Sequence, residues 1–463
     1  MNACRIVVFP SHQLGRRVFA ALIGLSTFAE AVVLAQRPSR RAEPARVSSS
    51  AHPAVAQVGE AASLLKLGRL DEAERILRGV ISTTPRNPDA HNLLGIILDQ
   101  RGNAHEAERE YRTALRLNPN TISALANLGV LLVHTKRFDE AIKTFESVLR
   151  LAPDHPQATI NLGLLVTSRG EYERAVVLLK RARELQPGSF DVLYNLGISL
   201  YNLKHYDEAR AALQSASSLS TNAADPVYFL GLIAYERNQD ETARELWERA
   251  ITLNRNHGAA NFMLGELMAK RKDYSNAKTY YEKALAQDAG KVVYHIRLGG
   301  AYLYLRDFNT AFEIFKSASE RFPRVPETHY FLSIVARTRG DSNLALIALK
   351  KALEINPNYA DALGLHGVIL LDRGDLSEAE KLFRRALVSN SNNYNASYNL
   401  GRLLVKQQKF VEALPLLQRA GTIRPENSEV HYQLFLTYSR LGRKADADRE
   451  LEIFKRLSEE DKK

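Results

Sequence analysis

The residues best able to do chemistry in this 463-residue chain are twelve histidines, one cysteine and 52 acidic residues. Four of the histidines, His91, His295, His329 and His431, are separated by multiples of 34 residues. Such regularity could place metal ligands along one surface, but none of them belongs to an HExxH motif or another ligand spacing. We therefore interpret them as packing residues at equivalent places of a repeat, and we predict no metal site.

The sequence also lacks the motifs of common enzymes. The lone cysteine, Cys4, excludes a disulfide framework and a CxxC redox pair. The glycines recur at regular spacing rather than in a phosphate-binding loop, and no GxSxG motif occurs. We predict no catalytic residue, no cofactor and no enzyme activity. That the chain is itself an enzyme remains a further hypothesis. Catalytic activity of the purified protein alone would revive it.

Composition indicates a folded protein, with 45% hydrophobic and 25% charged residues. The formal net charge is +11, and the first 53 residues contribute +5 of it through seven arginines and two glutamates. Basic residues in the rest of the chain are not gathered in one stripe, so we expect no nucleic-acid partner.

The N-terminal segment has the features of an export signal. Arg16 and Arg17 precede an apolar run, Val18 to Ala35, which a polar stretch follows. This order indicates a signal peptide at residues 1–35 and a flexible linker at residues 36–53. Glu30 inside the run argues against a permanent membrane span. We predict an exported, periplasmic protein of a bacterial cell envelope; a cytoplasmic protein and one anchored by an uncleaved signal are the alternatives.

The rest of the chain, residues 54–461, consists of twelve 34-residue repeats without insertion or deletion. Positions below are counted within each repeat. Position 20 is alanine in all twelve repeats, position 7 is leucine in ten, position 8 is glycine in nine, and position 24 is always large and apolar. The repeats begin at residues 54, 88, 122, 156, 190, 224, 258, 292, 326, 360, 394 and 428.

The spacing within a repeat predicts two helices. Positions 4, 7, 8 and 11 fall at helical intervals, as do positions 20, 24 and 27, so each helix has one apolar stripe. Small residues at positions 8 and 20 let two antiparallel helices approach closely, and the bulky residue at position 24 fills the space beside them. One helix pair cannot bury both stripes alone, so each repeat must stack on the next.

This pattern resembles the tetratricopeptide repeat (TPR) family, whose Leu-Gly, Ala, aromatic and Pro positions are matched over about nine-tenths of the chain. The resemblance implies an all-α fold, a right-handed superhelical solenoid of antiparallel helix pairs whose first helices line a concave groove. We expect at least 22 helices and no strand, and we expect the charged twelfth repeat to act as a polar C-terminal cap.

The resemblance also implies that positions 2, 5, 6, 9, 12 and 13 face the groove. Position 6 is asparagine at Asn127, Asn161 and Asn195, which resembles the asparagine ladder that holds an extended peptide in the TPR region of O-GlcNAc transferase. Alternatively, asparagine is simply common at this position. Aromatic residues follow, for which packing between repeats is the alternative interpretation: Tyr194, Tyr201, Tyr228, Phe229, Tyr235 and Phe262.

We therefore predict a non-catalytic scaffold that binds proteins or extended peptides, principally in repeats 3 to 7, residues 122–291. A more charged groove in repeats 8 to 11 is the competing site and would favour an acidic partner, through Arg297, Arg337, Arg402 and Lys406. The alternative function is a substrate-recruiting subunit for a separately encoded enzyme, such as a glycosyltransferase or a polysaccharide synthesis or export complex. The sequence leaves the partner's identity and the oligomeric state open.

Overall fold

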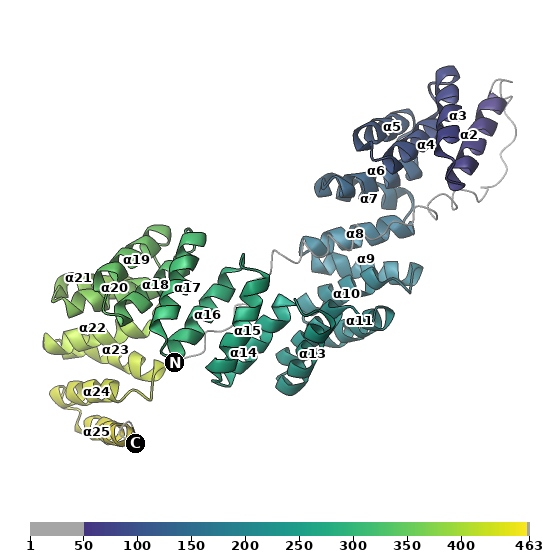
Figure 1. Cartoon of the computed structure of the whole chain (residues 1–463). Helices are drawn as coiled ribbons and strands as arrows, with labels where there is room; N and C mark the ends of the chain where they lie inside the picture. Colours follow the sequence, from purple (N-terminus) through teal and green to yellow (C-terminus); the bar gives the residue numbers. More distant parts are fainter. Residues whose placement is uncertain (1–50, 461–463) are drawn as a thin grey trace. The chain divides into compact units, whose positions relative to one another are not determined.

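The computed structural model describes residues 51–460, which form 24 α-helices and no strand (Figure 1). The predicted all-α fold of antiparallel helix pairs is confirmed. The predicted signal peptide and most of the predicted linker lie outside the described residues. The first described helix, α2, begins at Ala51, three residues before the expected start of the first repeat. None of the described helices is both long and apolar enough to span a bilayer.

Backbone contacts divide the described chain into two compact parts, here called the N-terminal half, residues 51–254, and the C-terminal half, residues 255–460. The sequence did not predict this division, because the 34-residue register continues through it. The N-terminal half contains α2 (Ala51–Lys66), α3 (Leu70–Thr83), α4 (Pro88–Gln100), α5 (Ala104–Leu117), α6 (Ile122–His134), α7 (Phe138–Leu151), α8 (Pro156–Ser168), α9 (Tyr172–Leu185), α10 (Phe190–Asn202), α11 (Tyr206–Leu219), α12 (Ala224–Glu236) and α13 (Asp240–Leu253).

The C-terminal half continues the alternation of first and second helices. It contains α14 (Gly258–Lys270), α15 (Tyr274–Gln287), α16 (Val292–Tyr304), α17 (Phe308–Arg321), α18 (Pro326–Thr338), α19 (Ser342–Ile355), α20 (Ala360–Asp372), α21 (Leu376–Ser389), α22 (Tyr394–Lys406), α23 (Phe410–Ile423), α24 (Ser428–Arg440) and α25 (Lys444–Glu460).

The turn inside each repeat is a three-residue C-cap that reverses the chain. Position 15 has a left-handed backbone in all twelve repeats, at six glycines and six other residues, among them Lys136 and Lys204. The next N–H donates to a first-helix carbonyl five residues back, as from Arg137 to Leu132 at 2.8 Å. This is the hydrogen bond of a Schellman motif, which satisfies the last carbonyls of the first helix. The second helix therefore begins at a fixed place in every repeat.

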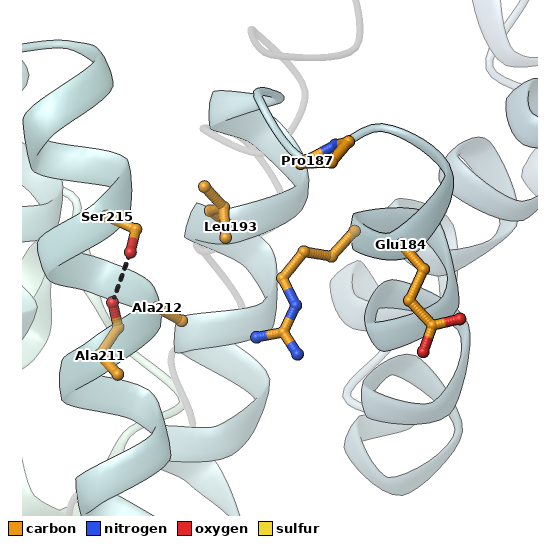
Figure 2. Close-up of a pocket in the computed structure, with 7 residues that line it drawn as sticks. Glu184, Pro187, Leu193, Ala211, Ala212 and Ser215 are labelled. Carbon is orange, nitrogen blue, oxygen red and sulfur yellow. Dashed lines mark hydrogen bonds between the residues drawn. The ribbon is translucent and has the colours of Figure 1, made fainter.

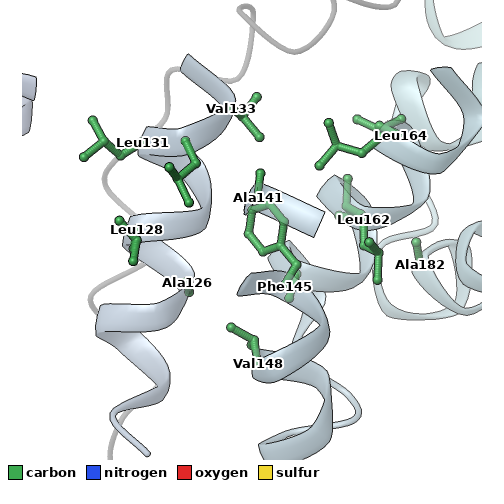
Figure 3. Close-up of a cluster of buried hydrophobic side chains, with 14 of the residues drawn as sticks. Ala126, Leu128, Leu131, Val133, Ala141, Phe145, Val148, Leu162, Leu164 and Ala182 are labelled. Carbon is green, nitrogen blue, oxygen red and sulfur yellow. The ribbon is translucent and has the colours of Figure 1, made fainter. Parts of the chain in front are cut away.

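The two helices of a repeat meet where the glycine at position 8 faces the bulky residue at position 24. A Cβ atom on Gly129 would lie 2.6 Å from the ring of Phe145, so only glycine lets the ring pack flat on the backbone. Phe145 and Ala141 are fully buried there. Figure 3 shows Phe145 between Leu128 of α6 and Leu162 of α8, so one side chain joins the two helices of its own repeat to the next repeat. Burying such a ring stabilises the fold by about 2–3 kcal/mol.

Successive repeats are linked differently by their first and second helices. Within each half, first helices contact the first helices of neighbouring repeats, as α4 contacts α6 and α22 contacts α24, whereas contacts between successive second helices are fewer. Successive second helices are joined instead by ion pairs between long side chains, such as that from Lys180 of α9 to Glu208 of α11 at 2.7 Å. First helices are therefore the more closely spaced layer, and they form the inner face of each half.

Candidate partner-binding surface

The first helices of the N-terminal half form a closely packed surface with few projecting groups. From α4 to α12 these five helices contain no lysine or arginine. In α8, ten of the thirteen residues are buried. Side chains at the predicted groove positions therefore reach solvent only in part, and this surface offers apolar and neutral polar groups rather than cations.

The asparagine row begins with an amide network that joins two repeats. The Asn127 Nδ2 atom donates to the Asn92 Oδ1 atom at 3.1 Å, and the Asn92 Nδ2 atom donates to the Ser123 Oγ atom at 3.1 Å. Asn92 lies at position 5, not position 6, so the pattern at position 6 did not identify it. The network ties α4 to α6 and includes Asn127, a side chain that the sequence suggested would contact a peptide.

The other two asparagines bond to their own helices. The Nδ2 atoms of Asn161 and Asn195 donate to the carbonyl oxygens of Gln157 and Asp191 at 2.9 and 2.8 Å. Asn161 is 8% exposed and Asn195 is fully buried. The expected row of amides, each offering a donor and an acceptor to a peptide in the groove, is therefore not what the structure has at Asn161 and Asn195. The Asn195 Oδ1 atom is buried and has no hydrogen-bond partner within residues 51–460, which leaves an acceptor as its unused capacity.

The predicted aromatic residues of repeats 5 and 6 do come together. The ring centroids of Tyr194, Tyr201 and Tyr228 lie 6.1, 5.7 and 5.4 Å from that of Phe229. We call these four residues the aromatic cluster. Tyr194 and Phe229 are buried, which fits packing between repeats, whereas Tyr201 and Tyr228 keep part of their surface in solvent. The cluster thus combines a rigid base with two accessible rings.

Two further aromatic residues lie outside this cluster. Tyr235 packs 5.7 Å from Trp247, whose indole Nε1 atom donates to the Tyr228 carbonyl at 3.2 Å. Phe262 belongs to the C-terminal half, where its ring lies 4.8 Å from Tyr294. The predicted site at residues 122–291 therefore includes parts of both halves, and we treat the N-terminal part by itself.

Carboxylates are the charged groups of this surface. Burial raises the pKa of Asp191 at the start of α10, and burial also raises the pKa of Asp99 at the end of α4, against the opposing effect of His134. Burial, followed by the nearby Glu236 carboxylate, raises the pKa of the Tyr201 hydroxyl. Tyr201 is therefore a neutral hydrogen-bond donor at neutral pH, and the surface disfavours an acidic ligand.

The histidine set has a structural role in separate repeats. In each of His91, His295, His329 and His431, the Nε2 atom lies 2.9–3.1 Å from the carbonyl oxygen six residues earlier. These histidines therefore bind the loop that enters their own helix, in agreement with a packing role. Across residues 51–460, no three His, Cys, Asp or Glu side chains converge as a metal site would require.

Two shallow depressions lie on the second-helix side and were not predicted. One lies between α9 and α11 and is lined by Pro187, Leu193, Ala211 and Ala212 (Figure 2). The other lies between α7 and α9 over Leu162. Charged side chains also line both depressions, among them Arg183 and Glu184 in the first and Glu146 and Arg174 in the second. Both depressions are open, whereas a small-ligand site is concave and buries most of its ligand, so neither resembles a substrate site.

Comparison with known proteins agrees with this architecture. A sequence model described as tetratricopeptide repeat matches residues 58–120, 97–156, 228–292, 296–360 and 365–428. A model described as anaphase-promoting complex, cyclosome, subunit 3 matches residues 134–216. No relative was found among curated protein sequences.

Solved structures with similar repeats superpose only loosely. The APC/C hetero-tetramer Cut9–Hcn1 has a TM-score of 0.44 at 14% identity, covering 86% of this chain and 92% of that chain. Yeast Tom70 has a TM-score of 0.41 at 14% identity, covering 85% and 96%. YrrB, described as a TPR protein with an unusual peptide-binding site, has a TM-score of 0.39 at 22% identity, covering 42% and 97%. Because the repeat model matches well over half of the residues, this chain belongs to the tetratricopeptide repeat family.

Proposed function

We propose that the protein is a non-catalytic scaffold that binds an extended segment of a partner protein along the first helices of repeats 3 to 6. The observation that carries the proposal is the aromatic cluster, in which Tyr201 and Tyr228 remain accessible above the buried Phe229 ring. Rings of this kind bury an apolar side chain while their hydroxyls stay wet.

The binding mode follows from the groups that the surface leaves unused. An extended peptide presents backbone N–H donors, and the Asn195 Oδ1 atom is a buried acceptor without a partner inside the described chain. Asn195 is fully buried, so a bound peptide reaches this atom only if the side chains over α10 move. One bulky apolar side chain of the ligand buried on Tyr201 and Tyr228 contributes about 2–3 kcal/mol. Specificity and most of the affinity would then come from the rings.

The chain contains its own reporter for this site. Trp247 is the only tryptophan, and its indole donates to the backbone carbonyl of Tyr228. A ligand that moves Tyr228 or Tyr235 should therefore change the emission of a single, identified fluorophore. Peptides selected from a random extended library can be titrated into the full chain with this signal.

Tyr201→Ala and Tyr228→Ala should each weaken a selected peptide at least about tenfold, which corresponds to losing part of one buried side chain. Tyr432→Ala is the matched control, because Tyr432 is a 39% exposed tyrosine on a first helix of the other half. Unchanged affinity in both cluster variants would refute the proposed site. Binding lost equally in the Tyr432 variant would place the ligand elsewhere.

The alternative is a scaffold that recruits a substrate for a separate enzyme. It predicts two simultaneous partners, a peptide at the aromatic cluster and an enzyme on another surface. Affinity purification of a Tyr201→Ala variant tests it, because the enzyme should remain bound while the peptide is lost. Loss of both partners would favour the simple scaffold.

A further inference from the structure

The first helices of the C-terminal half carry cations that those from α4 to α12 lack. They contain six basic residues, Lys270, Arg297, Arg337, Arg402, Lys406 and Arg440. Two of the predicted groove arginines are neutralised by carboxylates. The Arg297 Nε atom lies 2.9 Å from a buried Glu266 oxygen, and Arg337 lies 3.1 Å from Asp372. These two arginines therefore already have carboxylate partners within the fold.

The last two first helices are different. Arg402 and Lys406 of α22 and Arg440 of α24 are exposed, and no carboxylate forms an ion pair with any of them in the described part of the chain. We call these three residues the basic face. The two helices carry one carboxylate between them, Glu429, so their side-chain charge is +3 − 1 = +2 with neutral histidine.

Position in the repeat brings the three cations to one side. Arg402 and Lys406 are one helical turn apart, so they project from the same face of α22. Lys406 and Arg440 occupy the same position of successive repeats, and α22 contacts α24 directly. The basic face is therefore a compact group on the inner layer of the last two repeats.

One member of this group is already held in place. The Arg402 guanidinium lies 5.7 Å from the centroid of the Tyr398 ring, and the Tyr398 hydroxyl donates to Glu429 at 2.9 Å. Glu429, the one carboxylate on these two helices, is thus bonded to a tyrosine. An arginine positioned on a ring loses less side-chain freedom when a carboxylate binds.

We propose that the basic face binds an acidic segment of a partner protein, at a site separate from the aromatic cluster. Residues one helical turn apart are spaced about 6 Å, which matches alternate side chains of an extended strand at about 6.6 Å. Carboxylates at alternate positions of such a segment can reach Arg402 and Lys406 together, and Arg440 of the neighbouring helix adds to the positive charge around them.

The compactness of the group favours a short acidic peptide over a nucleic acid. Nucleic-acid binding needs cations along a stripe that follows many phosphates. Here three cations lie within two repeats, and the preceding first helix, α20, has no basic residue. The basic face therefore matches a ligand that carries two or three carboxylates.

The test uses the full chain and a fluorescein-labelled decapeptide in which glutamate alternates with serine. Anisotropy should report binding that weakens as salt rises, because exposed charge pairs are screened. The same peptide with glutamine in place of glutamate should not bind. Neutralising the basic face with R402Q, K406Q and R440Q should weaken the glutamate peptide at least about tenfold.

The matched control neutralises three exposed lysines of second helices in the same half, with K316Q, K350Q and K351Q. This variant has the same net charge and should keep near-normal affinity. Equal loss in both variants, or binding of the glutamine peptide, would overturn the proposal. So would tighter, basic-face-dependent binding of a single-stranded oligonucleotide or of phosphatidylglycerol vesicles. Tyr201→Ala should leave the glutamate peptide bound, so this test is independent of the proposed function.

Discussion

Two adjacent glycines in α16 give a sharp test of how the repeats pack. Gly299 occupies position 8, and a Cβ atom there would lie 2.5 Å from the Phe315 ring. Gly300 follows directly, and a Cβ atom there would meet nothing within 4 Å. An alanine at either residue adds one methyl group to the same helix, so the two variants differ only in what surrounds that methyl group.

The magnitudes follow from two opposing effects. Alanine stabilises a helix interior by about 1 kcal/mol relative to glycine, and this gain is common to both variants. At Gly299 the added methyl must displace Phe315, which is fully buried and stacked 5.3 Å from Phe331, and such overpacking costs about 1–3 kcal/mol. We expect Gly300→Ala to stabilise the protein by up to about 1 kcal/mol. Gly299→Ala should be less stable than Gly300→Ala by about 1–3 kcal/mol.

Local measurement is required because repeat arrays do not always unfold in one step. Native-state amide hydrogen exchange of peptides from α16 and α17 reports the opening free energy of that repeat in each variant. Faster exchange is expected in Gly299→Ala and slower exchange in Gly300→Ala. If Gly299→Ala protects α16 as well as Gly300→Ala does, then the close approach of positions 8 and 24 does not constrain the repeat, and the packing argument fails.

Three further predictions concern the turn, a partly buried histidine and the N-terminus. Lys204→Gly should stabilise the protein by about 1 kcal/mol, measured by chemical denaturation, because Lys204 has a left-handed backbone at φ 62°; Gly170→Ala, at φ 78°, should do the reverse. Burial lowers the pKa of His366 below its usual 6.5, so the unfolded chain binds that proton more readily and stability should fall as pH drops below 6.5. His366→Leu should reduce this acid sensitivity in pH-dependent thermal melts, and an unchanged pH profile would contradict the assignment. The apolar run Val18–Ala35 predicts a native protein that begins near Gln36; N-terminal sequencing tests this, and an intact Met1 in the cytosolic fraction would contradict it.

Most of the fold could be predicted from the sequence because the packing constraints repeat. Glycine at position 8 and a bulky residue at position 24 are required by one contact, that of Gly129 with Phe145 in repeat 3, and the alanine at position 20 is fully buried beside it at Ala141. That contact fixes which faces of the two helices meet. The helix boundaries follow from the left-handed residue at position 15, which is glycine in only half of the repeats and so was a weak signal by itself.

The candidate site was harder to predict because periodicity indicates which face a residue occupies but not how much its neighbours cover it. Asn195 is on the expected helix face, yet it is fully buried and bonded to its own helix. The aromatic residues of repeats 5 and 6 do meet, since rings at positions 5, 6 and 12 of adjacent repeats are large enough to touch, and their role in binding stays a prediction. Phe262 shows the limit of that reasoning, because the register continues where the compact halves divide.

The repeat register also carries information about which arginines are neutralised. Arg297 at position 6 pairs with Glu266 at position 9 of the preceding repeat, a separation of 31 residues. A carboxylate at that separation is visible in the sequence alone and indicates that Arg297 is neutralised. Arg402 is itself at position 9, and the residue 31 places after it, at position 6 of the next repeat, is Gln433, so the same rule assigns no carboxylate to Arg402. Pairing of this kind is expected only between first helices of one half, where the layers are closest.

The contrast between the two inner surfaces predicts different responses to ionic strength. The aromatic cluster lies among helices without lysine or arginine, so a peptide bound there depends on apolar burial and should keep its affinity as salt rises. The basic face depends on three exposed cations, whose attraction is screened over about 8–10 Å at 0.1–0.15 M salt. Each ligand is titrated into the protein at low and at high salt. Trp247 emission reports binding at the aromatic cluster, and peptide anisotropy reports binding at the basic face, so the salt dependence of each site is measured separately. If both signals weaken in parallel as salt rises, binding at the aromatic cluster is also ionic, and the carboxylates Asp191 and Glu236 become the groups to substitute.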